Sequence, residues 1–308
     1  MSASSSRTSR RIDSSRRPTG SRPLSTGTIA VADGRTFSCF SVGSIAGTYE
    51  EIYVPRIFIP WARLLLDRAA LRPGEAVLDI ATGPGTVARI AAEQVGPRGR
   101  VVGADFSEAM IAIAKGKPGL TSAAPVEYIV SPAAPLTVED DTFDVVTCQQ
   151  GLQFFPDRAA AVREMYRALK PGGRVVAAVW REIALQPSFA ALDAALRESL
   201  PADHAEPYGA PFRWPSAEAL KVGFTDQGFT GVSITELRHP LTYEGGIAQA
   251  IATLAASPVA STIAALDAET ATRLRSAAAR HLAPLVEDGQ VRTQMVSNLV
   301  TATKPDRS

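Results

Sequence analysis

Short, almost unbroken apolar runs alternate with amphipathic stretches through the middle of this chain. The stretch from Thr86 to Gln94, for example, carries its apolar residues at helical spacing. Apolar runs of five or six residues are typical of strands buried on both faces of a parallel sheet. These runs lie at 76–80, 101–105, 126–130, 143–148 and 175–180. Strands that alternate with helices in this way predict an α/β fold with a doubly wound, mostly parallel sheet.

Local signals mark the ends of several predicted helices. Ser107 is expected to cap a helix over 108–115, and Asp157 to cap another that follows the fourth strand. The sequence KPGG at 170–173 should stop this second helix. Pro55 and Pro60 interrupt the first segment, so a helix is expected to start at Pro60.

Four segments differ in character. Residues 1–36 are rich in Ser and Arg and are expected to form a disordered tail, with an organelle-targeting segment as the alternative. Residues 37–72 should form a helical cap and 73–185 the nucleoside-binding core. Residues 186–308 should complete the sheet with strands at 232–237 and 294–302. An Ala-rich helical stretch at 246–284 should cover a pocket.

Composition narrows the class of protein. The chain has 308 residues, 45% of them hydrophobic and 20% charged, with a formal net charge of +1. This balance gives no field for nucleic acid, and no apolar run is long enough for a transmembrane helix. The two cysteines and three scattered histidines predict neither a disulfide framework nor a metal site. A cytoplasmic protein is expected, and a homodimer is left open.

The run VLDIATGPGT at 77–86 carries the main chemical signal. Gly83 and Gly85 form a tight turn between a strand and a helix, where the helix N-terminus favours an anionic group. A second acid, Asp105, ends the next strand and suits the two hydroxyls of a ribose. This pair of features predicts an adenosine-type ligand, and the glycine spacing also fits a nicotinamide cofactor.

Four blocks in order carry a family resemblance. They read VLDIATGPGT (77–86), VVGADFSEAM (101–110), DTFDVVTCQQGLQFFPD (141–157) and REMYRALKPGGRVV (163–176). With these blocks the chain resembles the class I S-adenosylmethionine-dependent methyltransferases, in the group of the ubiquinone and menaquinone methyltransferases. The resemblance implies a seven-stranded Rossmann-like sheet, S-adenosylmethionine as cofactor and a small-molecule acceptor. The last two blocks argue against a dehydrogenase.

The resemblance also implies roles for matched residues. Asp79 and the turn from Ala81 to Gly85 would hold the methionine end of the cofactor, and Asp105 the ribose. Around the adenine would lie Phe106, Met110 and the backbone N–H of Ala133. The implied cofactor-binding residues are Asp79, Ala81, Thr82, Gly83, Gly85, Asp105, Phe106, Met110, Ala133 and Gln149. Asp79 could instead only brace the loop, and Phe106 and Met110 could belong to the core.

Two positions depart from the family pattern. The family usually has glycine where this chain has Ala81, and alanine tolerates positive φ poorly, so a slightly different loop is expected. The family also usually has an acid after the third strand, where this chain has Pro132. A backbone group would then have to meet the adenine amino group.

Three residues are the candidates for catalysis. His204 lies in a Pro-rich segment at 201–215, where a substrate-covering element is expected, and it could act as a base. Tyr49 could orient the acceptor or face the sulfonium, and Gln150 would lie with Gln149 near the transferred methyl group. His239, His281, Glu50 and Glu51 are the further base candidates.

These observations together predict a methyltransferase that acts on an apolar natural product, quinone or lipid-like molecule. Oxygen is preferred over carbon as the methylated atom. The alternatives are a cyclase that uses the sulfonium only as a fixed charge, and an inactive cofactor-binding regulatory subunit. No aromatic and basic platform suggests a nucleic-acid partner.

Overall fold

The computed structural model describes residues 43–214 and 216–306, together with Met1 and two strands of two residues each. The strands are β1 (Ile29–Ala30), β2 (Thr36–Phe37), β3 (Ala76–Ile80), β4 (Arg100–Asp105), β5 (Val126–Val130), β6 (Phe143–Gln149), β7 (Leu169–Trp180), β8 (Thr230–Tyr243), β9 (Val286–Glu287) and β10 (Gln290–Thr303). Most of the predicted tail, at 2–28 and 31–35, lies outside the described residues.

Helices connect these strands and cover the sheet. The α-helices are α1 (Gly43–Tyr53), α2 (Ile59–Ala69), α3 (Thr86–Val95), α4 (Glu108–Gly116), α5 (Arg158–Ala168), α6 (Pro187–Ser199), α7 (Ala202–Ala205), α8 (Ala217–Thr225), α9 (Gly246–Ala252), α10 (Ala260–Ala264) and α11 (Ala268–Leu282). Shorter helical turns are η2 (Val54–Phe58), η3 (Leu152–Phe154), η4 (Ile183–Leu185), η5 (Glu206–Phe212), η6 (Thr253–Ala256) and η7 (Ala283–Leu285). Within the described ranges, no helix is long and apolar enough to cross a membrane.

The main sheet has the order β5-β4-β3-β6-β7-β10-β8, with the short β9 paired to β10. The strands from β5 to β7 pair in parallel, whereas β10 is antiparallel to both β7 and β8. This confirms the predicted doubly wound, mostly parallel sheet. Because β3 and β6 are central neighbours with connections leading outward on both sides, their carboxyl ends form the switch point where ligands bind in such sheets.

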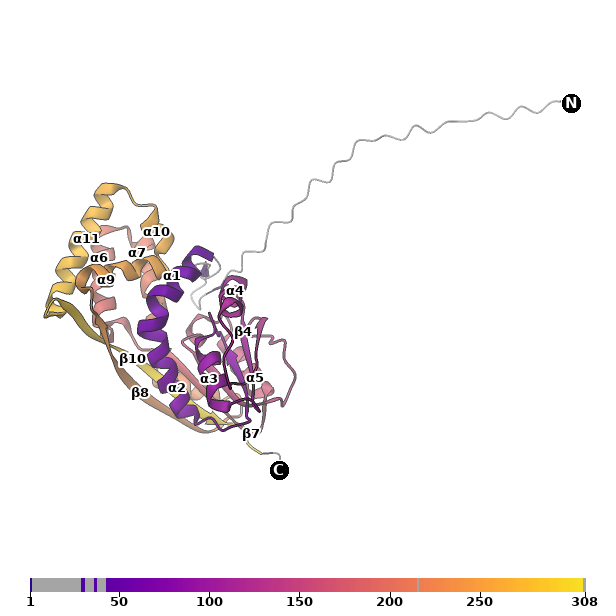
Figure 1. Ribbon diagram of the computed structural model, residues 1–308. Helices are drawn as coiled ribbons and strands as arrows, with labels where there is room; N and C mark the ends of the chain where they lie inside the picture. The colour runs from indigo at the N-terminus through magenta and orange to yellow at the C-terminus, as the bar shows by residue number, and fades with distance from the viewer. Residues whose placement is uncertain (2–28, 31–35, 38–42, 215, 307–308) are drawn as a thin grey trace.

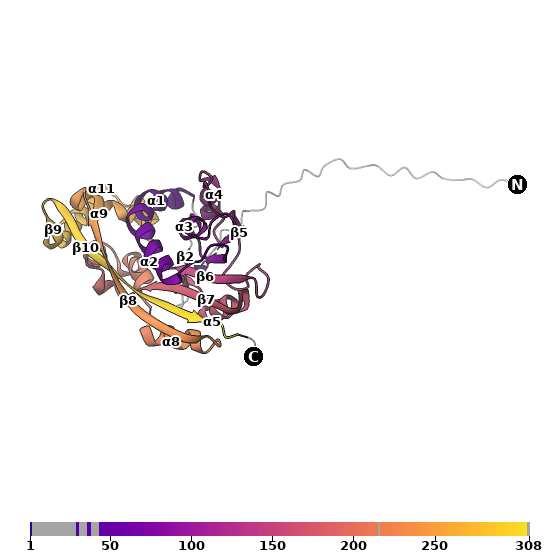
Figure 2. The same ribbon diagram turned by 60° about the horizontal axis from the view of Figure 1, so that its bottom comes forward.

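Three apolar clusters hold the molecule together. One cluster packs α2 and α3 on one face of the sheet, and a second packs α5 and α8 on the other face (Figure 2). The third lies among α6, α9, α11 and the ends of β8 and β10. Figure 1 shows these helices gathered at one end of the molecule, where the long strands β8 and β10 reach them. We call this end, from α6 to η5 and from α9 to η7, the helical cap; it is distinct from the N-terminal cap segment expected at 37–72.

Several boundaries agree with the sequence, and the capping residues explain them. Strands β3 and β5 have the predicted bounds. The side chain of Ser107 accepts a hydrogen bond from the backbone N–H of Met110 at 3.2 Å, and Asp157 accepts one from Ala160 at 2.8 Å. Both caps satisfy N–H groups that the first helical turn leaves without partners.

The first segment corrects the sequence prediction. Helical structure runs without a gap from α1 through the π-helical turn η2 into α2. Pro55 and Pro60 each stand at the first or second position of a new helical type. Proline is tolerated there because the switch in hydrogen-bond pattern already leaves an N–H group without an intrahelical partner.

Strands β7, β8 and β10 are longer than predicted. Strand β7 begins at Leu169, and residues 170–173 bulge out of its ladder with β6, where Asp144 is passed over. Strand β8 contains Pro240 but lies at the edge of the sheet, where a missing N–H breaks no ladder.

Candidate functional site

A cavity of about 320 Å³ opens at the carboxyl ends of the parallel strands. Residues that end or directly follow these strands line it: Ala81 after β3, Asp105 of β4, Ser131 after β5, Gln149 of β6 and Trp180 of β7. The other walls come from α1, η2, η5, the end of η6 and β10. One cavity therefore joins the predicted nucleoside-binding core to the helical cap.

Asp105 is the charged group at the floor of this cavity. Its Oδ2 accepts a hydrogen bond from the backbone N–H of Gly83 at 2.8 Å, and its Oδ1 accepts one from Ser107 at 2.9 Å. Burial raises the pKa of this carboxyl to about 6, although the two N–H groups act in the opposite direction. The carboxylate is therefore held in one orientation and keeps lone pairs for a ligand.

The loop after β3 is braced from below by Asp79. The Asp79 carboxylate accepts hydrogen bonds from the hydroxyls of Thr82 at 2.6 Å and Thr147 at 2.8 Å. Burial has the largest influence on this carboxyl and raises its pKa to about 7. Neither Asp79 nor Thr82 lines the cavity. For these two residues, the structure supports the loop-bracing alternative rather than direct contact with a ligand.

Gly85 lies against the side chain of Tyr128. A Cβ atom at Gly85 would lie 2.4 Å from the Tyr128 hydroxyl, and the residue does not line the cavity. Gly83 differs, because it lines the cavity, has φ +55° and leaves open space where a Cβ would project. Gly83 thus forms the cradle that the turn was expected to provide.

Ala81 has the left-handed conformation that glycine usually supplies. Its φ is +56°, so alanine adopts here a backbone conformation that usually favours glycine. A Cβ at Gly151 would come within 2.5 Å of the Ala81 Cβ. The methyl group of Ala81 therefore fits because Gly151 has no side chain.

On the opposite side of the floor, apolar groups flank Asp105. Phe106, Met110, Pro132 and Ala133 all line the cavity. Met110 is 4% exposed, so it also belongs to the packed interior. The apolar side chains of α4 and of the segment after β5 therefore suit an apolar ring.

Three other predicted residues line the cavity near the ends of β3 and β6: Tyr49, Gln149 and Gln150. The Tyr49 ring stacks on Phe58 with centroids 4.9 Å apart. The Gln149 side chain donates a hydrogen bond to the backbone carbonyl of Phe58 at 3.0 Å. This contact ties the end of β6 to the helical segment that covers it.

The predicted base His204 lies outside the cavity. It is exposed on α7, and the other two histidines are also elsewhere. His239 Nδ1 lies 2.7 Å from the carbonyl of Pro240, and His281 pairs with Glu198. The two acidic candidates do not line the cavity either: Glu50 pairs with Lys117 at 2.7 Å, and Glu51 is exposed. The short helix α7 turns the His204 side chain to solvent, which removes it as a candidate base.

The Pro-rich segment nevertheless reaches the cavity through residues that the sequence analysis did not single out. Tyr208, Pro211 and Phe212 of η5 line one wall, beside Phe189 of α6. The Ala-rich stretch reaches the cavity at residues 256–258. Buried aromatic residues in a segment rich in proline are the signal that could have identified this wall. The uncharged aromatic lining from both halves comprises Tyr49, Tyr53, Phe58, Phe106, Phe154, Phe155, Trp180, Phe189, Tyr208 and Phe212.

The residues present fit S-adenosylmethionine. The oriented carboxylate of Asp105 matches a ribose diol, the open cradle at Gly83 admits a ligand close to the backbone, and the apolar pair Phe106 and Met110 matches a purine. Among the described residues, no group of three or more His, Cys, Asp or Glu side chains could hold a metal ion.

Comparison with known proteins gives matches over the same part of the chain. The sequence profile of the ubiE/COQ5 methyltransferase family matches residues 43–202. A ubiquinone/menaquinone biosynthesis C-methyltransferase UbiE of Escherichia coli is 34% identical over 188 residues, which cover 58% of this chain and 75% of that protein. The enzyme of the same name from Hydrogenovibrio crunogenus is 37% identical over 139 residues. This alignment covers 43% of this chain and spans about half of the Hydrogenovibrio protein, 54%.

Solved structures share the fold. A candidate methyltransferase of Bacillus halodurans aligns over 79% of this chain and 98% of its own, with 25% identity and a TM-score of 0.51. Phosphoethanolamine N-methyltransferase 2 of Haemonchus contortus, solved with S-adenosyl-L-methionine, covers 86% of this chain and 58% of its own. Its identity is 21% and its TM-score 0.55, so this likeness concerns the fold alone.

Proposed function

The chain belongs to the ubiE/COQ5 methyltransferase family and is an S-adenosylmethionine-dependent enzyme, and we propose that it methylates an apolar, uncharged ring compound of quinone or natural-product type. One observation carries this proposal. Ten aromatic residues line the cavity, and its described lining contains no Lys, Arg or His. Such a wall favours an apolar acceptor and offers no cationic side chain to pair with a charged group on that acceptor.

The residues would divide the work as follows. Asp105 would accept hydrogen bonds from the ribose hydroxyls, while Phe106 and Met110 would pack against the adenine. Ala133, next to Pro132, would offer its backbone N–H to the adenine ring. When bound, S-adenosylmethionine supplies a methyl group that its positive sulfur already activates. The chain then has to align the acceptor with that methyl group and exclude water.

Carbon is the methylated atom that we favour, in place of the oxygen expected from sequence. An alcohol or phenol oxygen of high pKa needs a general base, and the predicted base His204 is outside the cavity. The Escherichia coli relative is named as a C-methyltransferase of ubiquinone and menaquinone biosynthesis. An electron-rich ring carbon in an aromatic cavity is consistent with both observations: the carbon–methyl bond would form as the sulfur–methyl bond breaks, and the ring proton, which is acidic in the resulting cation, would then pass to water without a dedicated base.

The proposal is tested by incubating the full chain with S-adenosylmethionine and a panel of hydroquinones and phenols. Mass spectrometry should find a product heavier by one methylene group, with the label on carbon when a labelled methyl donor is used. Calorimetry with S-adenosylhomocysteine and with NAD provides the binding control. Cofactor binding without transfer to any member of the panel would favour the cyclase or the regulatory subunit.

Asp105→Asn should weaken S-adenosylhomocysteine binding by about tenfold or more, because charge-assisted hydrogen bonds are stronger than neutral ones. Isothermal titration calorimetry measures the change. Asp226→Asn is the matched control, since Asp226 is an exposed acid at the end of α8. Equal affinities for all three proteins would count against the ribose assignment.

A further inference from the structure

Gln150 combines a strained backbone with a buried side chain at the cavity. Its φ is +52°, a conformation that costs a non-glycine residue energy and is often found at functional sites. Its backbone N–H donates to the carbonyl of Ala178 at 3.0 Å, so strand β7 holds the residue in place. Only 4% of Gln150 is exposed, although it lines the cavity.

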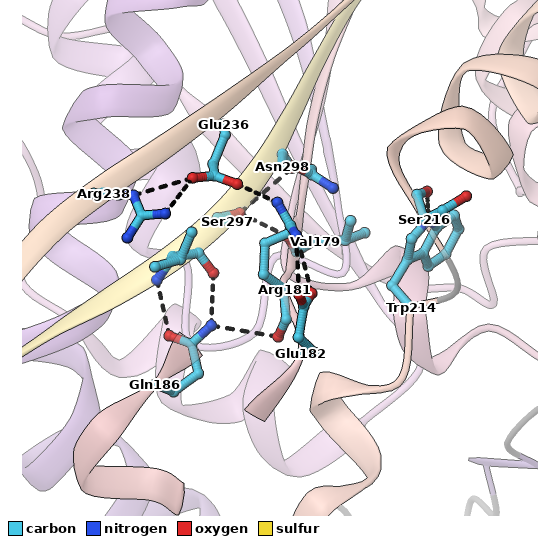
Figure 3. A network of polar contacts seen from close by, with 11 residues as sticks. Val179, Arg181, Glu182, Gln186, Trp214, Ser216, Glu236, Arg238, Ser297 and Asn298 are labelled. Atoms are coloured by element: carbon cyan, nitrogen blue, oxygen red, sulfur yellow. Dashed lines mark hydrogen bonds and ion pairs between the residues drawn. The ribbon is translucent and has the colours of Figure 1, made fainter. Parts of the chain in front are cut away.

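Ser297 of β10 determines how the Gln150 amide is oriented. Its hydroxyl is buried and donates to the carbonyl of Val179 at 2.8 Å, with the carbonyl of Asn298 as a longer alternative at 3.4 Å (Figure 3). A hydroxyl has one proton, so with that proton given to a backbone carbonyl its oxygen can only accept. The group of Gln150 that lies 3.3 Å from Ser297 Oγ must therefore be the amide nitrogen.

This orientation leaves the side-chain oxygen of Gln150 free. Among the described residues, Gln150 Oε1 has no hydrogen-bond partner. A buried carbonyl oxygen without a partner is costly, and such groups are rare unless a ligand or water satisfies them. The oxygen belongs to a residue that lines the cavity at the carboxyl end of β6, beside Ala81 and Gln149.

We propose that Ser297 is a positioning residue that presents Gln150 Oε1 to a hydroxyl or N–H group of the methyl acceptor. An amide oxygen accepts hydrogen bonds but is not a base at neutral pH, so Gln150 orients the donor and leaves its proton in place. This inference rests on the proposed function and narrows it. The acceptor is a neutral ring compound with a hydrogen-bond donor close to the methylated atom.

Ser297 reaches Gln150 from the C-terminal part of the chain. Ser297 lies in β10, outside residues 43–202 that match the family profile. Strand β10 enters the sheet between β7 and β8, and register pairs Ser297 with Trp180. Ser297 in the last strand thus contacts the side chain of Gln150, which directly follows β6.

The test compares two probes with the same ring, one with a hydroxyl donor and one with a methoxy group in its place, and the variants below separate the loss of the donor from the added methyl group. Binding of 1-naphthol and of 1-methoxynaphthalene is measured by calorimetry on the full chain saturated with S-adenosylhomocysteine. The unaltered protein should prefer 1-naphthol by roughly fivefold or more, which is the effect of one hydrogen bond. Anilines as a third probe show whether an N–H group serves equally well.

Gln150→Leu and Ser297→Ala should each abolish that preference and leave the affinity for S-adenosylhomocysteine unchanged. Ser233→Ala, an exposed serine on the neighbouring strand β8, is the control and should keep it. A preference that persists in both variants, or is absent from the unaltered protein with S-adenosylhomocysteine bound, overturns the inference. Failure to bind S-adenosylhomocysteine at all would instead overturn the proposed function.

Discussion

At the scale of single residues, the loop after β3 shows how one methyl group changes its surroundings. Ala81 has a left-handed backbone, which costs alanine about 1 kcal/mol or more relative to glycine. The missing side chain at Gly151 leaves room for the Ala81 Cβ. The departure from the family pattern could be read from the sequence, but its partner could not, because the two positions meet only when β3 and β6 pair.

Exchange of these two residues tests the pairing. Gly151→Ala alone should lower the free energy of unfolding by roughly 1–3 kcal/mol, because the two Cβ atoms would be 2.5 Å apart. Ala81→Gly added to this variant should recover most of the loss, since it removes both the clash and the left-handed alanine. Urea unfolding of the single and double variants gives the coupling energy. Additive effects would show that the residues are independent.

The two buried acids beneath the cavity should make the ligand-free protein less stable as pH rises. Burial raises the pKa of Asp79 to about 7 and of Asp105 to about 6, from ordinary values near 3.8. Between pH 4 and 7 the folded state therefore holds protons that the unfolded state has released. These two groups together should lower the free energy of unfolding by roughly 5–6 kcal/mol over this range.

Urea unfolding at several pH values without cofactor measures this dependence. Asp79→Asn should remove the larger share, because Asp79 has the higher pKa. A pH dependence in Asp79→Asn identical to that of the unaltered protein would contradict the raised pKa of Asp79, whereas the slope of the unaltered protein also contains acids of lowered pKa such as Glu164 and Glu182.

At the scale of elements, buried strands and capped helices were predictable, whereas junctions were not. The short, mostly apolar runs at 76–80 and 126–130 mark β3 and β5, and Ser107 marks the start of α4 by its own hydrogen bond. A helical segment and the start of α2 near Pro60 were predicted, but the continuous helical structure across both prolines was not, because a proline usually ends a helix. Here a π-helical turn accommodates Pro55, and packing against the cap keeps the segment helical.

One side chain joins three elements at the amino end of β3. Arg174 of β7 donates to the carbonyls of Ala69 and Ala70 at the end of α2, and pairs with Glu75 at 2.9 Å. Its guanidinium is planar, so it can make these contacts together, which a lysine ammonium cannot.

Arg174→Lys should therefore lower the free energy of unfolding by roughly 1–3 kcal/mol, through loss of the two-pronged contact with Glu75 and of the carbonyl contacts. Arg275→Lys is the control, because Arg275 is exposed on α11 and its guanidinium bonds only to Thr272 one turn away. Equal thermal stability of the two variants would show that the junction contributes little.

At the scale of the whole molecule, the cavity has two walls of different origin. The floor comes from the strands of the matched region, and its residues were predictable because the family motif spans them. The other wall brings together η5, residues 256–258 and β10. Residues 257 and 295 lie about 50 and about 90 positions after residue 208 in the chain. Sequence periodicity carries no information on such contacts. The segment that contains His204 reaches the cavity, but it does so through Tyr208, Pro211 and Phe212.

Two matched substitutions should separate these walls. Phe106→Leu should weaken S-adenosylhomocysteine binding by roughly threefold or more, with little change in acceptor KM. Phe212→Leu should raise acceptor KM by a similar factor and leave cofactor binding intact. Both residues line the cavity, and each change removes part of an aromatic ring. Calorimetry and initial rates give the comparison, and parallel effects in both assays would show that the walls are not distinct.

Strand β10 has a consequence for how the protein is made. It follows all other strands in the chain but lies inside the sheet, between β7 and β8. While the ribosome is still adding its residues, β7 has an open edge and Gln150 lacks the serine that orients it. The nascent chain can therefore close the cofactor half of the molecule first. The acceptor half is completed only once β10 has been synthesised and has paired, and until then the open edge of β7 is the kind of strand edge that chaperones protect.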